Sequence, residues 1–130
     1  MRKDLSYLLL SASLASQASE MMSIRELKIW IAEHLQADVS VEDLADRMSM
    51  SVRNFERVFT REVGTTPSQN VLQMRVEVAR RQLERTERGL KQVASTAGFG
   101  SVDIMRRAFV RLLGITPRRY RELPNHPNGE

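Results

Sequence analysis

The sequence predicts an all-α fold of about seven helices, arranged as two similar units on either side of one central helix. Three observations lead to this prediction. Apolar residues recur at helical spacing through most of the 130-residue chain. Aromatic residues make up only 5%, and Gly and Pro number 6 and 4, which disfavours a fold of many short strands. Residues near position 50 also have counterparts near position 100, which indicates a duplication.

The first helix is expected to begin after Ser23. Residues 1–22 combine a short apolar segment with a tract rich in Ser, Ala and Gln, so we interpret them as a linker or the end of a preceding domain. A cleaved signal peptide is disfavoured, because Asp4 lies where such a signal is basic. Ser23 and Glu26 form a capping box, and apolar residues then follow at helical spacing: Ile24, Leu27, Ile31 and Leu35.

The first repeated unit is expected over residues 40–64. Ser40 is a suitable N-cap for a short helix that reaches Met48. Ser51 opens a longer helix, and Gly64 is a suitable residue to follow its end. These signals predict a short helix, a tight turn and a longer helix.

The central linking helix is expected over residues 67–85. Thr66 supplies its N-cap, Pro67 fits its first turn and Gln69 completes a capping box. Four apolar residues keep the helical period along it: Leu72, Val76, Ala79 and Leu83. One of three arginines on this helix is expected to brace the two units through an internal ion pair: Arg75, Arg80 or Arg81.

The second unit is expected over residues 90–114. A short helix over 90–97 should stop at Gly98, and a longer helix over 101–113 should stop at Gly114. No segment of the chain has the pattern of a strand.

A last short turn is expected after the second unit. It begins at Thr116-Pro117, and the Pro- and Asn-containing residues 122–130 are expected to form a flexible tail. The folded domain is therefore expected over residues 23–121.

The two units are related residue by residue. The offset is forty-nine before the turn and fifty after it, because Gly100 is an extra residue in the second copy. Ala45 and Ala94 are small where two helices must cross closely, and the turn holds Ser49 in one copy and Gly98 in the other. A glycine would be more usual than Ser49. This is the helix-turn-helix pattern, whose second helix enters the major groove of DNA. Further matched pairs are Ser51 and Ser101, Phe55 and Met105, Arg57 and Arg107, Phe59 and Phe109, Arg61 and Arg111, and Gly64 and Gly114.

Charge is unevenly distributed along the chain. Residues 75–121 hold 12 Lys and Arg against 4 Asp and Glu, whereas residues 1–50 hold 5 against 8. A basic stretch within apolar periodicity indicates a folded surface for a polyanion, although a merely solvated positive face gives the same count. A helical bundle that docks an acidic protein partner therefore stays an alternative.

The composition disfavours several other classes of protein. The chain has no Cys, so disulfides and zinc–thiolate sites are excluded, and a reducing compartment, the cytoplasm, is expected. His34 and His126 lack metal-ligand spacing, and no arrangement of nucleophile, paired carboxylates or metal ligands indicates catalysis. We therefore expect neither enzymatic activity nor a cofactor. No stretch is long and apolar enough to span a bilayer, so no membrane partner is expected.

Residues 40–121 resemble the AraC/XylS family of bacterial transcription regulators. The second unit carries the family's signature nearly throughout, with Val-Ala-Ser-Thr-Ala-Gly-Phe-Gly-Ser from Val93, Arg-Arg-Ala-Phe from Arg106 and Gly-Ile-Thr-Pro-Arg-Arg-Tyr-Arg from Gly114. The Gly-Phe-Gly-Ser and Arg-Arg-Ala-Phe stretches are similar to the branch whose regulators carry a DJ-1/PfpI amidotransferase-like sensor domain ahead of this module.

This resemblance implies two helix-turn-helix subdomains that bind double-stranded DNA sequence-specifically. Free-standing members of the family have roughly this length, but residues 1–22 resemble the exit from another domain, so we expect the chain to be the C-terminal part of a larger, ligand-sensing bacterial regulator. RNA polymerase is then a further candidate partner, and dimerisation would use a domain absent from this chain.

The helical period separates a buried face from an outer face on each longer helix. The inward residues are expected to be Phe55, Val58 and Phe59 in the first unit, and Met105, Ala108, Phe109 and Leu112 in the second. The outer residues are then Arg53, Glu56, Arg57 and Thr60, and Asp103, Arg106, Arg107 and Val110.

The resemblance places the base-edge contacts within or beside these outer faces, at Arg53, Glu56 and Arg57 and at Asp103, Ile104 and Arg107. An arginine can bind O6 and N7 of guanine with two hydrogen bonds. Glu56 and Asp103 could accept from cytosine N4 or hold a neighbouring arginine in place. Ile104 could touch a thymine methyl or shield the edge of the core. Phosphate contacts are expected from Ser51, Thr60, Ser101, Arg106, Arg118 and Arg119.

Overall fold

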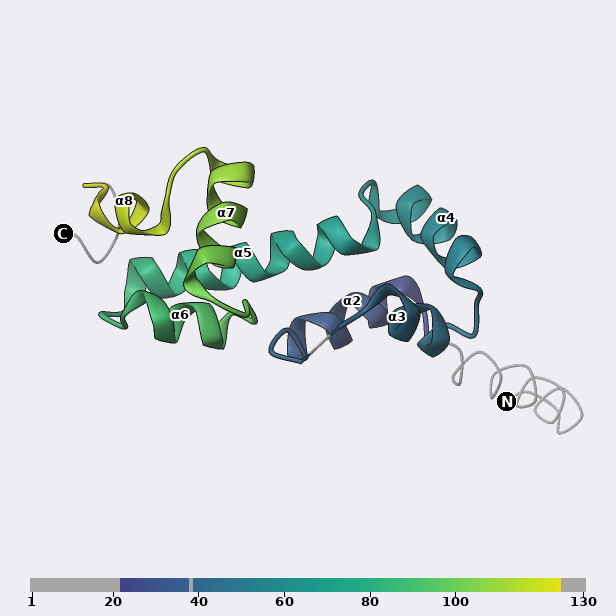
Figure 1. The fold of residues 1–130 in the computed structure, drawn as a ribbon. Coiled ribbons are helices and arrows are strands. Elements are labelled where there is room, and N and C mark those ends of the chain that lie inside the picture. Colours follow the sequence, from purple (N-terminus) through teal and green to yellow (C-terminus); the bar gives the residue numbers. More distant parts are fainter. Residues whose placement is uncertain (1–21, 38, 125–130) are drawn as a thin grey trace, which may run out of the picture.

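The computed structural model describes residues 22–37 and 39–124, and within them the secondary structure is entirely helical. All of the linker expected over residues 1–22 except Met22, and most of the tail expected over 122–130, lie outside these ranges. The helices, labelled as in Figure 1, are α2 (Ile24–Glu33), α3 (Val41–Arg47), α4 (Val52–Val63), α5 (Pro67–Arg85), α6 (Leu90–Thr96), α7 (Val102–Leu113) and α8 (Pro117–Glu122). The all-α prediction and the linking helix over 67–85 are confirmed.

The described residues form two lobes that share α5 (Figure 1). One lobe consists of α2, α3 and α4, and the other of α6, α7 and α8. The helix α5 contributes to the hydrophobic core of each lobe, because Val71 packs in the first core and Val76, Ala79 and Leu83 pack in the second. The linking helix is therefore a structural member of both lobes as well as their connection.

The helix boundaries follow from the expected capping residues. The hydroxyls of Ser40, Ser51 and Ser101 each accept a hydrogen bond from a backbone N–H in the first turn of the helix that they cap. Ser23 and Thr66 form complete capping boxes. The last helix, α8, extends through Glu122, so the tail begins later than the expected residue 122.

The same turn joins the two helices in each repeated unit. In the first unit the Ser49 and Met50 N–H groups donate to the carbonyls of Asp46 and Ala45, over 3.0 and 2.9 Å. In the second unit the Gly98 and Phe99 N–H groups make the equivalent bonds, over 3.1 and 2.8 Å. This is the Schellman arrangement, which needs a left-handed residue after the helix. Ser49 has a φ of 58° and Gly98 a φ of 93°, so Ser49 adopts the turn despite its side chain.

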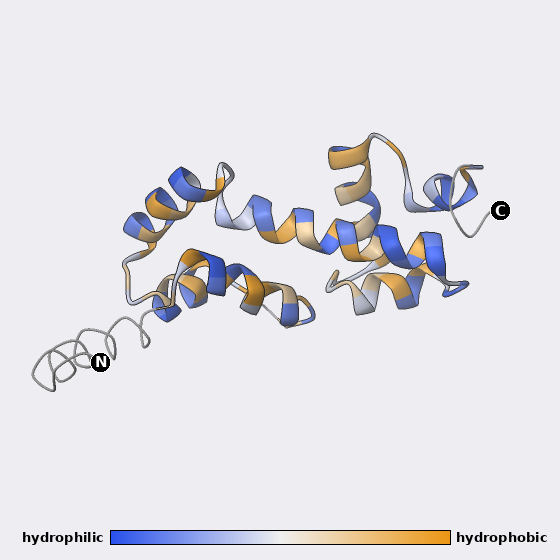
Figure 2. Ribbon diagram, turned by 180° about the vertical axis from the view of Figure 1, so that it is seen from behind, coloured by the Kyte–Doolittle hydropathy of each residue, from blue (hydrophilic) through white to orange (hydrophobic). Residues whose placement is uncertain are grey.

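The buried faces of the longer helices differ from the expected ones at one clear position. Leu112 was expected to face inward but is 36% exposed. Its counterpart fifty residues earlier is Glu62, which is also exposed, so this helix position lies at the rim of the core in both units. Val58 is only half-buried, whereas Phe55, Phe59, Met105 and Phe109 are fully buried as expected. Figure 2 shows the result on α7, whose last turns remain hydrophobic beyond the core. No helix among the described residues combines the length and apolar character needed to cross a bilayer.

Candidate nucleic-acid interface

The helices α4 and α7 are presented in the same way by their two units. Each has twelve residues, begins after a serine N-cap and ends at a left-handed glycine. Each is preceded by a seven-residue helix, α3 or α6, that buries the small residue expected at the crossing, Ala45 or Ala94. The short helix therefore packs against one face of the longer helix and leaves the opposite face of the longer helix exposed.

The open face of α4 carries the residues predicted to read the first half of a DNA site. Phe55 and Phe59 are fully buried, with ring centroids 5.6 Å apart, and they anchor the inner face. Arg53, Glu56 and Arg57 are exposed on the other side. The Arg57 guanidinium donates to Oδ1 of Asn54 over 2.6 Å, one turn earlier on the same helix. This bond directs the guanidinium toward the N-terminal end of α4.

The open face of α7 holds a three-residue charge cluster. The Asp103 carboxylate forms an ion pair with Arg107 over 2.8 Å and a second with Arg106. The side chains of Arg106 and Arg107 remain 52% and 71% exposed. These two ion pairs are compatible with Asp103 holding neighbouring arginines in place, which is one of the two roles considered for it. Ile104 is 46% exposed beside this cluster, which leaves its side chain available to a ligand.

The residues predicted to contact phosphate lie mostly at exposed helix starts. The hydroxyl oxygens of Ser51 and Ser101 accept from the N–H groups of Asn54 and Ile104, over 3.2 and 3.1 Å. Each hydroxyl keeps its own hydrogen, so it can still donate to a phosphate oxygen. Arg118 and Arg119 are exposed on the first turn of α8 and Arg106 on α7, whereas Thr60 is only half-exposed.

Comparison with known proteins bears on this arrangement. A family described as a helix-turn-helix domain matches residues 44–123, which is more than half of the chain. The DNA-binding domain of AdpA, a global transcriptional factor solved in complex with a target DNA, superposes with a TM-score of 0.74 and 38% identity. The match covers 78% of this chain and 91% of that one. The chain belongs to the AraC-type helix-turn-helix family of transcription regulators.

Other relatives agree with this assignment. The HTH-type transcriptional regulator Rv1931c of Mycobacterium tuberculosis is 46% identical over 82 residues, which is 63% of this chain and 32% of that protein. A transcriptional regulator with an AraC-type DNA-binding domain from Chromobacterium violaceum superposes with a TM-score of 0.70 and 26% identity, over 87% of this chain and 98% of that one. The chain spans about a third of the length of the first curated relatives that it matches.

The linking helix of this AraC-type domain uses its arginines in two ways. Arg80 pairs with Glu77 over 2.8 Å and with Glu84 over 3.8 Å, and it donates to the Tyr120 hydroxyl of α8 over 3.4 Å. The Arg80 hydrogen bond lowers the pKa of Glu77, while burial and a hydrogen bond with Glu84 raise the pKa of Tyr120. Arg80 therefore fixes α8 against α5 within the second lobe.

Arg75 attaches the linking helix to the first lobe. Its Nε and one terminal nitrogen donate to the carbonyls of Leu35 and Ala37, each over 3.2 Å. These carbonyls belong to the segment that follows α2. Arg80 and Arg81 both pair with Glu77 within α5, and the ion pair expected between the two units stays a prediction.

Sequence reasoning missed one residue of the domain that connects the lobes. Gln36 follows α2 in the first lobe, and its Nε2 donates to the Thr96 carbonyl at the end of α6 over 3.2 Å. Nothing in the local pattern around Gln36 predicts a contact sixty residues away.

Proposed function

We propose that this AraC-type domain binds double-stranded DNA sequence-specifically, with α4 and α7 inserted into successive major-groove turns. The observation that carries the proposal is the equivalent exposure of Arg57 and Arg107, at the same position of two identically capped helices. Successive turns of the major groove lie about 34 Å apart on one side of the duplex. One chain with two such helices can therefore read two half-sites.

Base reading would be divided unequally between the helices. Arg53 and Arg57 are available on α4, each able to form a bidentate contact with a guanine. On α7 the corresponding contact falls to Arg107, with Ile104 against a thymine methyl. Asp103 would orient Arg107 during this contact, since it already pairs with that side chain.

Phosphate binding would fix the register of the domain on the duplex. The N-cap hydroxyls of Ser51 and Ser101 and the helix N-termini that they begin would each face a phosphate, and Arg118 and Arg119 would add charge from α8. If about six phosphates are neutralised, the affinity should fall with salt at a log–log slope of roughly −5.

Selection of bound duplexes from a random pool tests the proposal. We expect a site with two conserved blocks about one helical turn apart, 10 to 10.5 base pairs. Arg57→Ala and Arg107→Ala should each reduce the sequence preference in one block only. Arg25 is an exposed arginine on α2, and Arg25→Ala should leave the preference in both blocks unchanged. A single block, or uniform weakening by both variants across all sequences, would exclude two base-reading helices.

We further propose that the domain serves a longer regulator. Support comes from the share of curated relatives that it spans, about a third, and from the names of those relatives as transcription regulators. The Gly-Phe-Gly-Ser and Arg-Arg-Ala-Phe stretches favour an amidotransferase-like sensor domain in that protein. RNA polymerase contact and dimerisation through the sensor domain belong to the same proposal. Size-exclusion chromatography of the full-length product, with and without DNA, tests the dimerisation.

A further inference from the structure

The two lobes touch each other directly, in addition to being joined by α5. The segment that follows α2 in the first lobe lies against the turn between α6 and α7 in the second. We define the junction as five residues from three places in the chain. They are Leu35 and Gln36 after α2, Arg75 on α5, and Thr96 and Gly98 at the α6–α7 turn.

The hydrogen bonds of the turn do not by themselves require glycine at position 98. The equivalent turn of the first unit has the same hydrogen bonds and is formed by Ser49. Ser49 has a φ of 58°, within the left-handed range that a residue with a side chain can adopt, whereas Gly98 has a φ of 93°, where a side chain is strained. The surroundings of Gly98 add a second reason for the absence of a side chain there.

The Leu35 carbonyl occupies the space that a side chain at position 98 would need. A Cβ built on Gly98 would lie 2.8 Å from the Leu35 carbonyl carbon, would overlap its oxygen, and would lie 3.0 Å from Nε of Arg75. Two of these atoms are backbone, so they cannot rotate away as a flexible side chain would. The other left-handed glycines, Gly64 and Gly114, have no atom within 4 Å of such a Cβ. The close approach is specific to the junction.

The first lobe holds the Leu35 carbonyl firmly in this position. The Leu35 side chain is only 5% exposed and packs in the core of the first lobe. Its carbonyl also accepts the Arg75 Nε–H over 3.2 Å. The Gln36 side chain then reaches the Thr96 carbonyl over 3.2 Å, and the Thr96 hydroxyl donates to Gln82 of α5 over 2.7 Å. Both sides of the junction are thus attached to α5.

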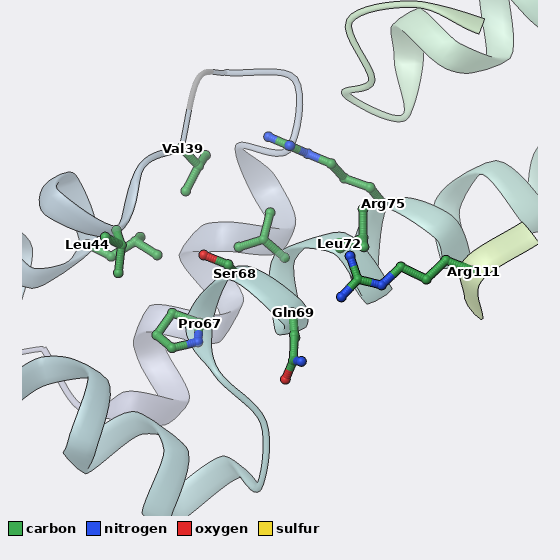
Figure 3. A pocket seen from close by; sticks show the side chains of 10 residues that line it. Val39, Leu44, Pro67, Ser68, Gln69, Leu72, Arg75 and Arg111 are labelled. Carbon is green, nitrogen blue, oxygen red and sulfur yellow. The ribbon is translucent and has the colours of Figure 1, made fainter. Parts of the chain in front are cut away.

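The junction lies close to the second recognition helix. Gly98 precedes the first residue of α7, Val102, by four positions. Arg75 also lines the groove between the lobes, where Figure 3 shows Arg111 of α7 extending over α5 toward Leu72 and Gln69. A shift of the α6–α7 turn away from Leu35 would therefore move α7 relative to the first lobe.

We propose that Gly98 is a positioning residue, whose contact with the Leu35 carbonyl sets the distance and rotation between the two recognition helices. The contact restricts the domain to DNA sites with one half-site spacing, and the phase between half-sites becomes part of the recognised sequence. This inference rests on the proposed function, since it requires that α4 and α7 bind one duplex together.

The test replaces Gly98 by the residue that the first unit already uses. Gly98→Ser and the matched control Gly114→Ser both place a side chain on a left-handed backbone in the second unit, but only the first meets the Leu35 carbonyl. Three duplexes are titrated by fluorescence anisotropy for each protein. One carries both selected half-sites, one carries them with the spacing changed by two base pairs, and one carries a single half-site.

The expected result is a selective loss. Two linked contacts on one duplex bind together more tightly than either alone, by a factor that depends on their geometry. Gly98→Ser should weaken binding to the duplex with the natural spacing by about tenfold or more. The variant should then bind the duplexes with the natural and the changed spacing nearly equally. Its affinity for the single half-site should be unchanged. Gly114→Ser should keep the preference of the unchanged protein for the natural spacing.

Two other results would overturn the inference in different ways. If Gly98→Ser keeps the spacing preference, the contact does not position α7. If the unchanged protein binds the two-site duplex no better than the single half-site, the proposed function itself fails. If circular dichroism shows that the Gly98→Ser protein is unfolded, the Gln36→Ala variant is used to test the junction instead. It removes the bond to Thr96 from an exposed side chain, and it should reduce the spacing preference by about two- to fivefold; no reduction refutes the proposal.

Discussion

Replacing Asp103 by asparagine would show how the second recognition helix controls its two arginines. The Asp103 carboxylate pairs with both Arg106 and Arg107. A phosphate or a guanine that binds either arginine must compete with this carboxylate. The asparagine would keep the size of the side chain while removing the charge, so both guanidinium groups would become available to DNA.

The size of the effect follows from the exposure of the pairs. The side chains of all three residues are about half-exposed or more, so each ion pair is worth about 0.2–1 kcal/mol. Losing both would favour non-specific binding by roughly 0.4–2 kcal/mol, or about 2- to 30-fold in affinity. The log–log salt slope should steepen by about 1, because one more phosphate is neutralised.

Anisotropy titrations of selected and random duplexes at several salt concentrations would measure this effect. We expect Asp103→Asn to raise affinity for random DNA more than for the selected site, so specificity falls. Glu62→Gln is the matched control on α4, because Glu62 is exposed and takes part in none of the ion pairs found among the described residues. The reasoning is refuted if Asp103→Asn leaves random DNA unaffected and weakens only sites with cytosine at one position. That outcome would make Asp103 a base reader.

Four further predictions concern single side chains. Arg107→Ala should cost about 1–3 kcal/mol at one base step, measured by titrating duplexes that differ at each position, and an equal loss on every duplex would contradict it. Phe109→Ala should lower the free energy of unfolding by about 3–5 kcal/mol in urea, because Phe109 is fully buried; a loss below about 1 kcal/mol would mean that the second core is not packed as described. Ser101→Ala should cost about 1 kcal/mol by the same assay, since it removes the cap of α7, and an unchanged midpoint would contradict the capping role. The lowered pKa of Glu77 means that its pairing with Arg80 stabilises the fold above the ordinary carboxylate pKa range, and that this contribution is lost as the pH falls through the lowered pKa. Arg80→Ala should therefore destabilise the protein by about 1 kcal/mol or less at pH 7 and by less in acid once Glu77 is protonated, and an effect that does not change with pH would exclude this pairing.

Local signals predicted the helices well, because each boundary is set by residues within one turn of it. Ser51 and Thr66 form their caps with residues three positions away, and Val76, Ala79 and Leu83 lie on the buried face that the helical period predicted. The exposure of Leu112 could not be predicted from the same helical period, because the period identifies the apolar face of a helix but not where the core ends along it. Its counterpart Glu62 would have corrected it.

The sequence predicted which residues belong to the candidate site better than it predicted the contacts that their side chains make. Arg57 and Arg107 were expected on the outer faces and are exposed there. The joint pairing of Asp103 with two arginines depends on rotamers that spacing alone leaves open. The contact between Gly98 and Leu35 joins residues sixty-three positions apart, so only the tertiary fold reveals it.

The division of α5 between two cores has a consequence for recombination between related regulators. Val71 belongs to one core and Val76 to the other, but the residues around them alternate: Leu72 packs against the second core, Met74 against the first, and Val78 against both. A chimera that joins the front half of one such regulator to the back half of another must therefore match residues of both parents along this stretch of α5, wherever in the stretch the exchange falls. Arg75 lies there, and its carbonyl partners come from the front half, so even a well-placed crossover must carry a compatible residue at that position.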